Sequence, residues 1–301
     1  MPLLKPPRLR IGDKIGVISP AGPVPKSELE PGLRFLESRG LRVHVAPHVY
    51  DAKDYLAGKD SDRLEDLHSV FRDRKIKAVF CTRGGYGCMR LLKDIDYDLI
   101  RESPKILVGY SDITALILAV YNKCGLVTFH GPMIREYIHG KEANLEDLIG
   151  FLLSKGEDVI SMEGSEVLRH GRRKGRLLGG NLSLICHLLG TSYLPSLEGG
   201  LLFLEDKGEA PYRIDRMLTH LMLSGQIEGL AGLVSGNFER CGESSAVDKL
   251  LEEFSSGFDF PIVRGFHLGH GLANTVLPIG VEAEIDTKDM TLKLLESWAA
   301  G

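Results

Sequence analysis

The sequence predicts an α/β protein of two domains: an N-terminal domain built on a parallel sheet, and a smaller C-terminal domain that is mixed α/β and barrel-like. At 301 residues the chain exceeds the usual size of a single hydrophobic core. From Lys14 to about Pro132, β-rich runs alternate with helical periodicity, which is typical of βαβ units. We therefore expect domains at 1–155 and 176–301, with an exposed linker at 156–175.

The alternation in the first domain can be followed element by element. The runs KAVF and KILVG are apolar after their lysines, as are strands buried on both faces of a parallel sheet. A helix near 144–156 closes the unit. In the second half strands dominate the end of the chain. The alternating segments of the first domain are 14–20, 27–40, 41–47, 60–74, 77–85, 105–111, 112–125 and 126–132.

Composition excludes several classes of partner. The formal net charge is only -4, so no broad field attracts nucleic acid or an anionic membrane. No apolar run is long enough to cross a bilayer, and the N-terminus lacks the pattern of a signal peptide. The five cysteines are odd in number and mostly lie in apolar runs, as free thiols do in a reducing compartment. We expect a cytoplasmic protein.

Unusual residues follow four of the predicted strands. These junctions read SPAGP at 19–23, TRGGYG at 82–87, GYSD at 109–112 and HGPM at 130–133. Ligands of an open parallel sheet bind beyond the carboxyl ends of its strands. We therefore expect the four junctions to converge on one crevice.

Ser111 stands between a buried strand and a long apolar helix, as the nucleophile of a strand-turn-helix elbow does. The backbone N–H of Asp112 would then stabilise an oxyanion from the N-terminus of that helix. The pattern is incomplete, because Ile113 occupies a position where the elbow usually has glycine. The alternative is that Ser111 or Asp112 only caps the helix.

The paired glycines Gly84 and Gly85 allow backbone to approach a ligand closely and leave N–H groups free to donate. A second oxyanion donor is expected there, although a tight turn without a ligand remains the alternative. The segment matches neither the dinucleotide-binding pattern nor a P-loop, so no nucleotide cofactor is expected.

A serine nucleophile needs a histidine base and an acid that orients it. His130 and His270 lie in glycine-flanked segments, whereas His44 and His68 fit a strand and a helix face. His267 and His270 lack a third ligand nearby, so we expect no metal.

The acid is expected to emerge from an apolar strand, and Glu205 directly follows LLFL. Asp206, Glu209 and Asp215 come close behind it. The alternative is that these acids open the next helix or pair with Arg213 and Arg216.

Together these segments resemble the LD-carboxypeptidase family of serine peptidases, which includes the microcin C immunity proteins. The likeness extends along nearly the whole chain, with eight motifs in the family's order. These are SPAGP at 19–23, DYLAGKDSDRLEDL at 54–67, TRGGYG at 82–87, GYSD at 109–112, HGP at 130–132, LLGGNLSL at 177–184, LFLEDKGEAPYRIDRML at 202–218 and GHGLANTVLPIG at 269–280.

The resemblance implies a triad of Ser111, Glu205 and His270. The serine would lie on a Rossmann-like (flavodoxin-like) N-terminal domain, and the glutamate and histidine on the C-terminal domain. It also implies oxyanion donors at the N–H groups of Gly85 and Asp112, a homodimer and no cofactor.

The reaction that the resemblance implies is hydrolysis of the amide bond before terminal D-alanine in a murein tetrapeptide, after a diaminopimelate or lysine residue. Binding of the terminal carboxylate suits a cation, and Arg83 and Arg213 are candidates beside Gly84.

Two other functions remain open. An immunity-type hydrolase would use the same triad on acyl-sulfamoyl or acyl-phosphoramidate adenylates. It would benefit from an aromatic platform for adenine, for which Trp298 or a tyrosine is available. In a non-catalytic ligand-binding protein, Ser111 would be only a helix cap.

Overall fold

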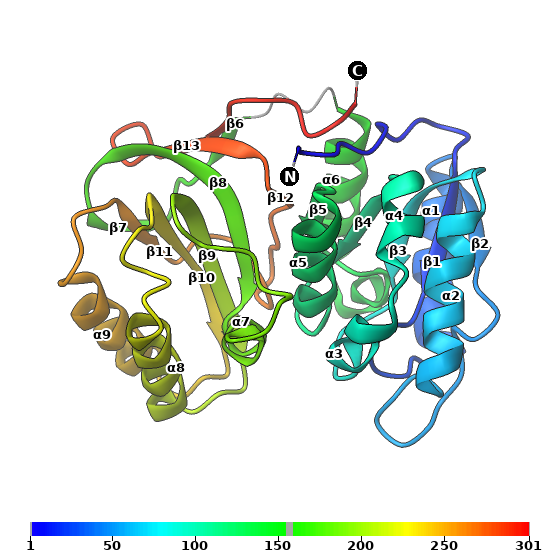
Figure 1. The fold of residues 1–301 in the computed structure, drawn as a ribbon, viewed down its shortest axis with the longest axis horizontal. Helices are drawn as coiled ribbons and strands as arrows, with labels where there is room; N and C mark the ends of the chain where they lie inside the picture. The colour runs from blue at the N-terminus through cyan, green and yellow to red at the C-terminus, as the bar shows by residue number, and fades with distance from the viewer. Residues whose placement is uncertain (1, 155–158, 301) are drawn as a thin grey trace.

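The computed structural model describes residues 2–154 and 159–300, which form two sheets side by side (Figure 1). The first sheet has the order β12-β5-β4-β3-β1-β2, and its strands β1 to β5 are parallel. This confirms the predicted parallel sheet. These five strands are β1 (Lys14–Ile18), β2 (Arg42–Val45), β3 (Ile76–Cys81), β4 (Ile106–Gly109) and β5 (Thr128–His130).

Helices connect the strands of the first sheet and cover it. Helix α5 (Ile113–Cys124) is buried along most of its length, because it packs between the first sheet and the second half of the chain. Its sequence is apolar on every side for the same reason. The others are α1 (Lys26–Ser38), α2 (Asp60–Arg72), α3 (Cys88–Leu91), α4 (Tyr97–Glu102) and α6 (Glu142–Leu153), with short 3-10 helices η1 (Leu92–Asp94) and η2 (Ile134–His139).

The second sheet is mixed and has the order β6-β14-β13-β8-β9-β10-β11-β7. Strands β8 to β11 are parallel, and the rest of the sheet is antiparallel. The mixed α/β fold class is thereby confirmed. The elements are β6 (Val159–Ser161), β7 (Glu166–Arg169), β8 (Arg172–Asn181), α7 (Leu182–Leu188), β9 (Gly200–Lys207), α8 (Pro211–Leu223), β10 (Gly232–Glu239), α9 (Ser244–Ser255), β11 (Ile262–Arg264), β13 (Glu282–Asp286) and β14 (Thr291–Leu294).

The segment 156–175, expected to be an exposed linker, is not a separate connection in its described part, although most of its side chains are at least partly exposed. It contains β6, β7 and the first residues of β8, so it belongs to the second sheet. The basic residues misled the prediction, because Arg172 and its neighbours are the exposed side chains of a strand. Arg172 pairs with Glu284 on the adjacent strand β13.

Strand β12 (Leu277–Ile279) belongs to the first sheet although it lies late in the sequence. It pairs antiparallel with β5, with Leu277 opposite His130. The chain thus leaves the second sheet after β11, completes the first sheet, and returns as β13. The loop before β12 therefore carries His270 to the boundary between the two sheets.

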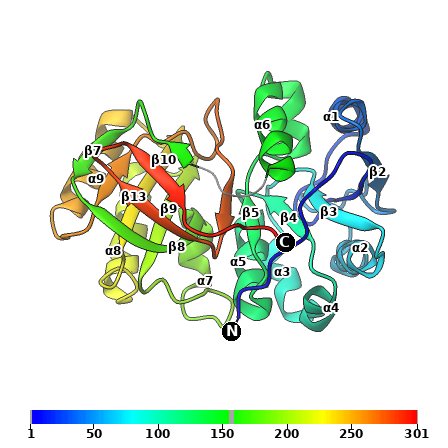
Figure 2. The same cartoon turned by 90° about the horizontal axis from the view of Figure 1, so that it is seen from above.

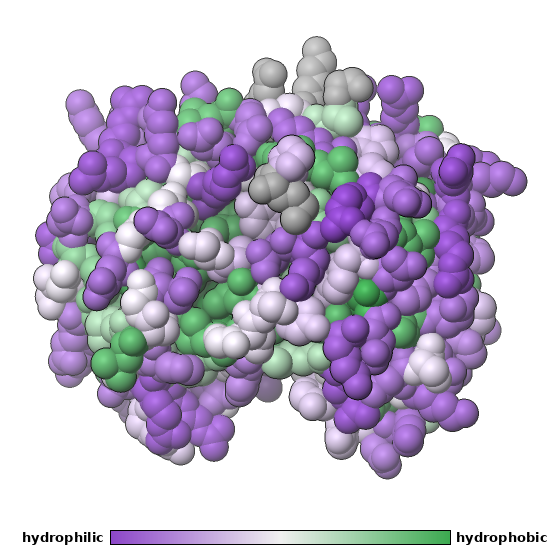
Figure 3. Space-filling view, in the orientation of Figure 1, coloured by the Kyte–Doolittle hydropathy of each residue, from purple (hydrophilic) through white to green (hydrophobic). Residues whose placement is uncertain are grey.

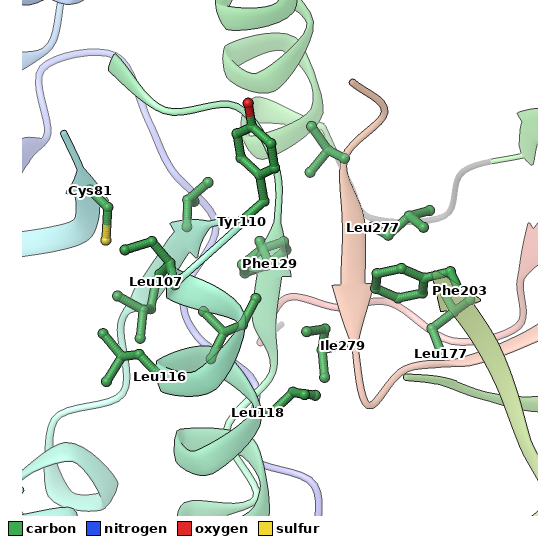
Figure 4. Close-up of a cluster of buried hydrophobic side chains, with 14 of the residues drawn as sticks. Cys81, Leu107, Tyr110, Leu116, Leu118, Phe129, Leu177, Phe203, Leu277 and Ile279 are labelled. Atoms are coloured by element: carbon green, nitrogen blue, oxygen red, sulfur yellow. The ribbon is translucent and has the colours of Figure 1, made fainter. Parts of the chain in front are cut away.

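The two halves share one apolar core. Figure 4 shows Leu277 and Ile279 of β12 between Phe129 of β5 and Phe203 of β9. Trp298 is fully buried, stacked on Phe151 and edge-on to Phe129. The boundary between the sheets is consequently packed like a domain interior.

Both ends of the described chain lie near this boundary, as the view from above shows (Figure 2). Pro7 forms a bridge with Ala300, and Leu4 forms one with Leu126 just before β5. Among the described residues, no helix combines the length and the apolar character needed to cross a membrane.

Candidate active site

A cavity of about 760 Å³ lies between the two halves of the molecule. The space-filling view shows a notch at the lower edge of this face, where α3 and α7 lie on either side in Figure 1. Both halves contribute to the wall, so the expected crevice exists. Its lining residues are Thr82, Arg83, Gly84, Gly85, Tyr110, Ser111, Asp112, Met133, Arg135, Glu136, Lys141, Asn181, Ser183, Leu184, Asp206, Lys207, Glu209, Glu239, Arg240, His270, Gly271 and Leu272.

Ser111 lies in the turn between β4 and α5 with a left-handed backbone, at φ +61°. Such a conformation is uncommon for a residue with a side chain, and it is concentrated at functional sites. The side chain of Asp112 does not cap α5, because its Oδ2 accepts the N–H of Cys88 at 2.9 Å. The turn therefore has the strained geometry of a nucleophile elbow.

The glycine loop after β3 lies directly against this turn. A Cβ built on Gly84 would be 2.9 Å from Ser111 Oγ and 3.4 Å from the backbone nitrogen of Asp112. Only a residue without a side chain permits this approach. The first junction, SPAGP, supports the loop from behind, since Gly22 N–H donates to Gly84 O at 3.2 Å.

Gly84→Ala is expected to lower turnover by about 100-fold, because the new methyl group would displace the Ser111 hydroxyl. The measurement is kcat/KM on the hydrolysed substrate, with circular dichroism to verify the fold. Gly150→Ala is the matched control, since nothing lies within 4 Å of its Cβ on α6. The control should keep full activity and gain about 1 kcal/mol of stability. Equal activity of the two variants would contradict the expectation.

His270 and Glu205 form a closely bonded pair, with 2.6 Å between Nδ1 and Oε2. Glu205 is fully buried at the end of β9, whereas His270 lies in the cavity wall. A carboxylate accepts hydrogen bonds only, so His270 carries its proton on Nδ1 and its Nε2 is the basic nitrogen. Gly269, at φ +87°, permits the contact, because a Cβ there would lie 2.4 Å from Glu205 Oε2.

A buried polar network fixes Glu205. Asn181 Nδ2 donates to Glu205 Oε1 at 3.2 Å and to Asp206 Oδ1 at 3.0 Å. Ser183 donates to Asp206 Oδ2 through both N–H and Oγ. Burial, together with the neighbouring Glu205, raises the pKa of Asp206. Asn181 therefore joins two adjacent buried acids, and its bond to Oε1 limits the freedom of the Glu205 carboxylate to rotate.

The two arginines predicted to bind substrate have different positions. Arg83 lines the cavity, but it donates to the backbone oxygens of Gly84 and Pro23 at 3.2 Å each. Burial lowers its pKa, and the charge of nearby Arg135 adds to this effect. Arg213 is exposed on α8 and pairs with Glu209, so it is not part of the cavity wall. Further cations of the wall are Arg135, Lys141, Lys207 and Arg240.

Of the remaining histidines considered from sequence, His130 is the one that approaches the site. It is fully buried behind Tyr110, whose ring lies 5.6 Å from it and 4.9 Å from the ring of His270. Its Nε2 lies 3.1 Å from Asn274 Oδ1. The fourth strand-end junction therefore contributes Met133 to the wall and supports the site from behind through His130.

Burial lowers the pKa of His130 from 6.5 to about 4. Between these two pH values the unfolded chain binds a proton on this histidine and the folded chain does not. The contribution of neutral His130 to the free energy of unfolding is therefore fully present above pH 6.5 and is lost as the pH falls towards 4. The expected loss is about 3 kcal/mol. Urea unfolding at pH 7 and pH 4.5 measures it, and His130→Gln should remove most of this difference. An undiminished acid loss in the variant would contradict the assignment.

One group in the described part of the chain has the spacing of a metal site. His48, Asp51 and Asp62 place their ligand atoms within 4.8 Å of one another, and all three are half-buried. None of them lines the cavity. His267 and His270 are not in this group.

Comparison with known protein families matches each half of the chain to a separate family domain. Residues 15–131 match the N-terminal domain of LD-carboxypeptidases, and residues 174–285 match the C-terminal domain. The chain therefore belongs to the LD-carboxypeptidase family, and it is a carboxypeptidase. The resemblance inferred from eight motifs is confirmed.

Three relatives cover nearly the whole chain. A probable murein peptide carboxypeptidase of Bacillus subtilis is 40% identical over 296 residues, which are 95% of this chain and 93% of the relative. The microcin C7 self-immunity protein MccF of Escherichia coli is 27% identical, over 99% and 97%. The crystal structure of a muramoyltetrapeptide carboxypeptidase from Oxalobacter formigenes is 31% identical, with a TM-score of 0.85 over 93% and 97%.

Several residues of the site have no role in the sequence analysis. Asn181 ends a strand, so the rule that placed Ser111 could have identified it. Lys141 and Glu136 are part of a helical segment after β5, where no strand-end signal applies. Tyr110 lies in the junction GYSD, directly after β4, but its side chain was given no role there.

Proposed function

We propose that the protein is a serine carboxypeptidase that hydrolyses the amide bond between a diamino acid and terminal D-alanine in murein tetrapeptides. The observation that carries this is the close bond between buried Glu205 and His270, because His270 and the strained Ser111 line the same cavity. Acyl transfer requires a histidine base fixed in one tautomer and a serine within its reach, and here His270 and the half-buried Ser111 line the same cavity. The names of the Bacillus subtilis and Oxalobacter formigenes relatives support the substrate class.

In the proposed reaction, His270 Nε2 takes the hydroxyl proton as Ser111 Oγ attacks the amide carbonyl. The backbone N–H groups of Asp112 and Gly85 stabilise the oxyanion, at the N-terminus of α5 and in the glycine loop. The imidazolium then protonates the leaving amine of D-alanine. Water, activated by the same imidazole, releases the acyl group and restores the serine.

The terminal carboxylate of the substrate requires a cation or free N–H donors. Arg83 is the candidate that remains from sequence, and its side chain also supports the glycine loop. Its planar guanidinium keeps Nη2 for a ligand after Nε and Nη1 have bonded to backbone. We therefore assign the carboxylate to Arg83 and not to Arg213.

The alternative, hydrolysis of acyl-sulfamoyl or acyl-phosphoramidate adenylates, is supported by the likeness to MccF. Such an enzyme would benefit from an aromatic platform for adenine. Trp298 is fully buried between Phe129 and Phe151, so its ring is not available to stack on a bound adenine. In the described cavity wall the aromatic side chain is Tyr110, which is itself buried. These features favour the tetrapeptide.

The test is incubation of the purified protein with four compounds: diaminopimelate-type and lysine-type murein tetrapeptides, and glutamyl-sulfamoyl and aspartyl-sulfamoyl adenosine. Mass spectrometry follows the release of D-alanine or of the free amino acid. Release of D-alanine from a tetrapeptide supports the proposal. Release of amino acid from the adenosines alone assigns the alternative function. Binding of any compound without release would indicate a non-catalytic ligand-binding protein.

Such an enzyme would act in peptidoglycan recycling, which places it in the cytoplasm. All five cysteines are buried and free, in keeping with a reducing compartment. The cytoplasmic location and the homodimer stay predictions.

A further inference from the structure

The loop between β11 and β12 carries His270, and it is held from both sides. On the side of the second sheet, Asn237 N–H and Nδ2 donate to Leu268 O at 3.0 and 3.1 Å. Glu205 holds the imidazole of His270 itself. Further hydrogen bonds to the loop come from the N-terminal half of the chain, which also carries Ser111.

The start of α6 supplies three of these contacts. Lys141 Nζ donates to His270 O at 3.1 Å, and Asn144 Nδ2 donates to Leu272 O at 3.0 Å. Asn144 Oδ1 accepts the N–H of Asn274 at 3.3 Å. Asn144 is buried, although it lies next to a helix terminus where a polar side chain would ordinarily be exposed.

Asn274 connects the loop to His130 of β5. Its Oδ1 accepts Gly269 N–H at 2.8 Å, and this bond identifies the atom as oxygen, because an amide NH2 cannot accept a proton there. His130 Nε2, at 3.1 Å from the same oxygen, must therefore carry a proton. Both side chains are buried, and His130 Nδ1 and Asn274 Nδ2 have no protein partner in the described part of the chain.

We propose that Asn274 and His130 are positioning residues that fix the backbone at Gly269 and so set the place of the His270 imidazole relative to Ser111. The proposal rests on the proposed function, in which His270 is the base for Ser111. Two features support a role beyond stability. The contact acts on the residue directly before His270, and it links that residue to β5, the neighbour of the strand that leads to Ser111.

The chemistry of the two groups explains why they are suited to this role. A neutral imidazole donates one bond in a fixed direction, and the amide oxygen of Asn274 accepts two bonds at once. Gly269 has no side chain that could pack against Glu205 and hold the residue in place. Hydrogen bonds to its backbone N–H therefore fix its position. A shift of about 1 Å in a catalytic group lowers turnover by about 100-fold.

The experiment compares matched variants in the full-length protein. Asn274→Ala and His130→Phe remove the contact, whereas Asn274→Asp and His130→Gln keep an acceptor or a donor in place. Asn122→Ala is the control, because Asn122 also joins the two halves, through bonds to Ser192 O and Leu194 O outside the cavity wall.

Three measurements are taken on every variant. They are kcat and KM on the hydrolysed tetrapeptide, the rate at which diisopropyl fluorophosphate labels Ser111, and the low-field proton resonance of His270 Nδ1–H. The labelling rate and the resonance do not depend on knowing the natural substrate. Thermal unfolding establishes that each variant is folded.

The expected result for Asn274→Ala and His130→Phe is a loss of about 10- to 100-fold in kcat and in the labelling rate, with KM unchanged and the resonance shifted or broadened. The conservative variants should recover most of the rate, and Asn122→Ala should match the wild type. If His130→Phe does not fold, Asn274→Ala decides alone, because it leaves the aromatic packing intact.

Wild-type labelling rates and an unchanged resonance in folded Asn274→Ala would overturn the proposal. Failure of the proposed function gives a different pattern. A wild-type protein that labels at Ser111 but releases no D-alanine has another substrate, and the variants can still be compared by labelling. A wild-type protein that does not label at Ser111 lacks the triad, and the positioning role is then overturned with it.

Discussion

Replacing Ser111 by alanine is expected to abolish hydrolysis while the fold survives. Loss of the nucleophile of a triad lowers kcat by up to about 10⁶-fold, and the remaining rate comes from the oxyanion hole and from binding. Alanine adopts the left-handed backbone of residue 111, at φ +61°, at a cost similar to that of serine. Stability should therefore change by less than about 0.5 kcal/mol.

The measurement for Ser111→Ala is single-turnover release of D-alanine, with thermal unfolding as the check on the fold. The control is Ser38→Ala, which removes an exposed hydroxyl at the end of α1 and should leave the rate unchanged. Turnover by Ser111→Ala within tenfold of the wild type would exclude Ser111 as the nucleophile. The alternative, in which Ser111 only caps helix α5, would then be favoured.

Glu205→Gln is expected to lower kcat by about 10⁴-fold without unfolding the protein. Asn181 Nδ2 faces the Oε1 position, so the new amide must place its oxygen there and its NH2 toward His270. That NH2 donates to Nδ1 and forces the imidazole proton onto Nε2. The histidine then has no basic nitrogen for Ser111, although its position is unchanged.

Kinetics and proton resonances of the His270 ring measure the effect of Glu205→Gln. The comparison is Asp206→Asn, which alters the adjacent buried acid. Asp206 accepts bonds from Asn181, Ser183 and Lys207, so an amide there meets a donor and costs about 1 to 3 kcal/mol of stability. The first variant should lose turnover but not stability. A rate above a tenth of the wild type in Glu205→Gln would contradict the role of Glu205.

The sequence was a good guide to the first sheet and a poor one to its edge. Alternating buried runs and helices predict parallel strands, because burial on both faces leaves a continuous apolar pattern. Strand β12 is three residues long, contains Pro278, and pairs with β5 about 150 residues earlier. Hydrophobic pattern does not encode such a partner, so from sequence this segment is expected in the second domain.

In the site, too, residues could be predicted where the local sequence identifies them, but not where their role depends on contacts with distant parts of the chain. Ser111 and the glycine loop follow from the rule of strand ends, and Glu205 from its place after an apolar strand. Arg213, the other candidate for the substrate carboxylate, lies outside the cavity wall and pairs with Glu209, which precedes α8. Lys141 has no such local signal, since its contact with His270 depends on how the two halves pack.

The late return of β12 to the first sheet has a consequence during synthesis. Until residues 277–279 leave the ribosome, β5 is an edge strand with unpaired backbone groups, and the apolar side chains that β12 covers are open to solvent. The nascent N-terminal half therefore cannot complete its own sheet, even though it is made first. Chaperone binding to ribosome-bound chains should persist until nearly the whole polypeptide has been translated.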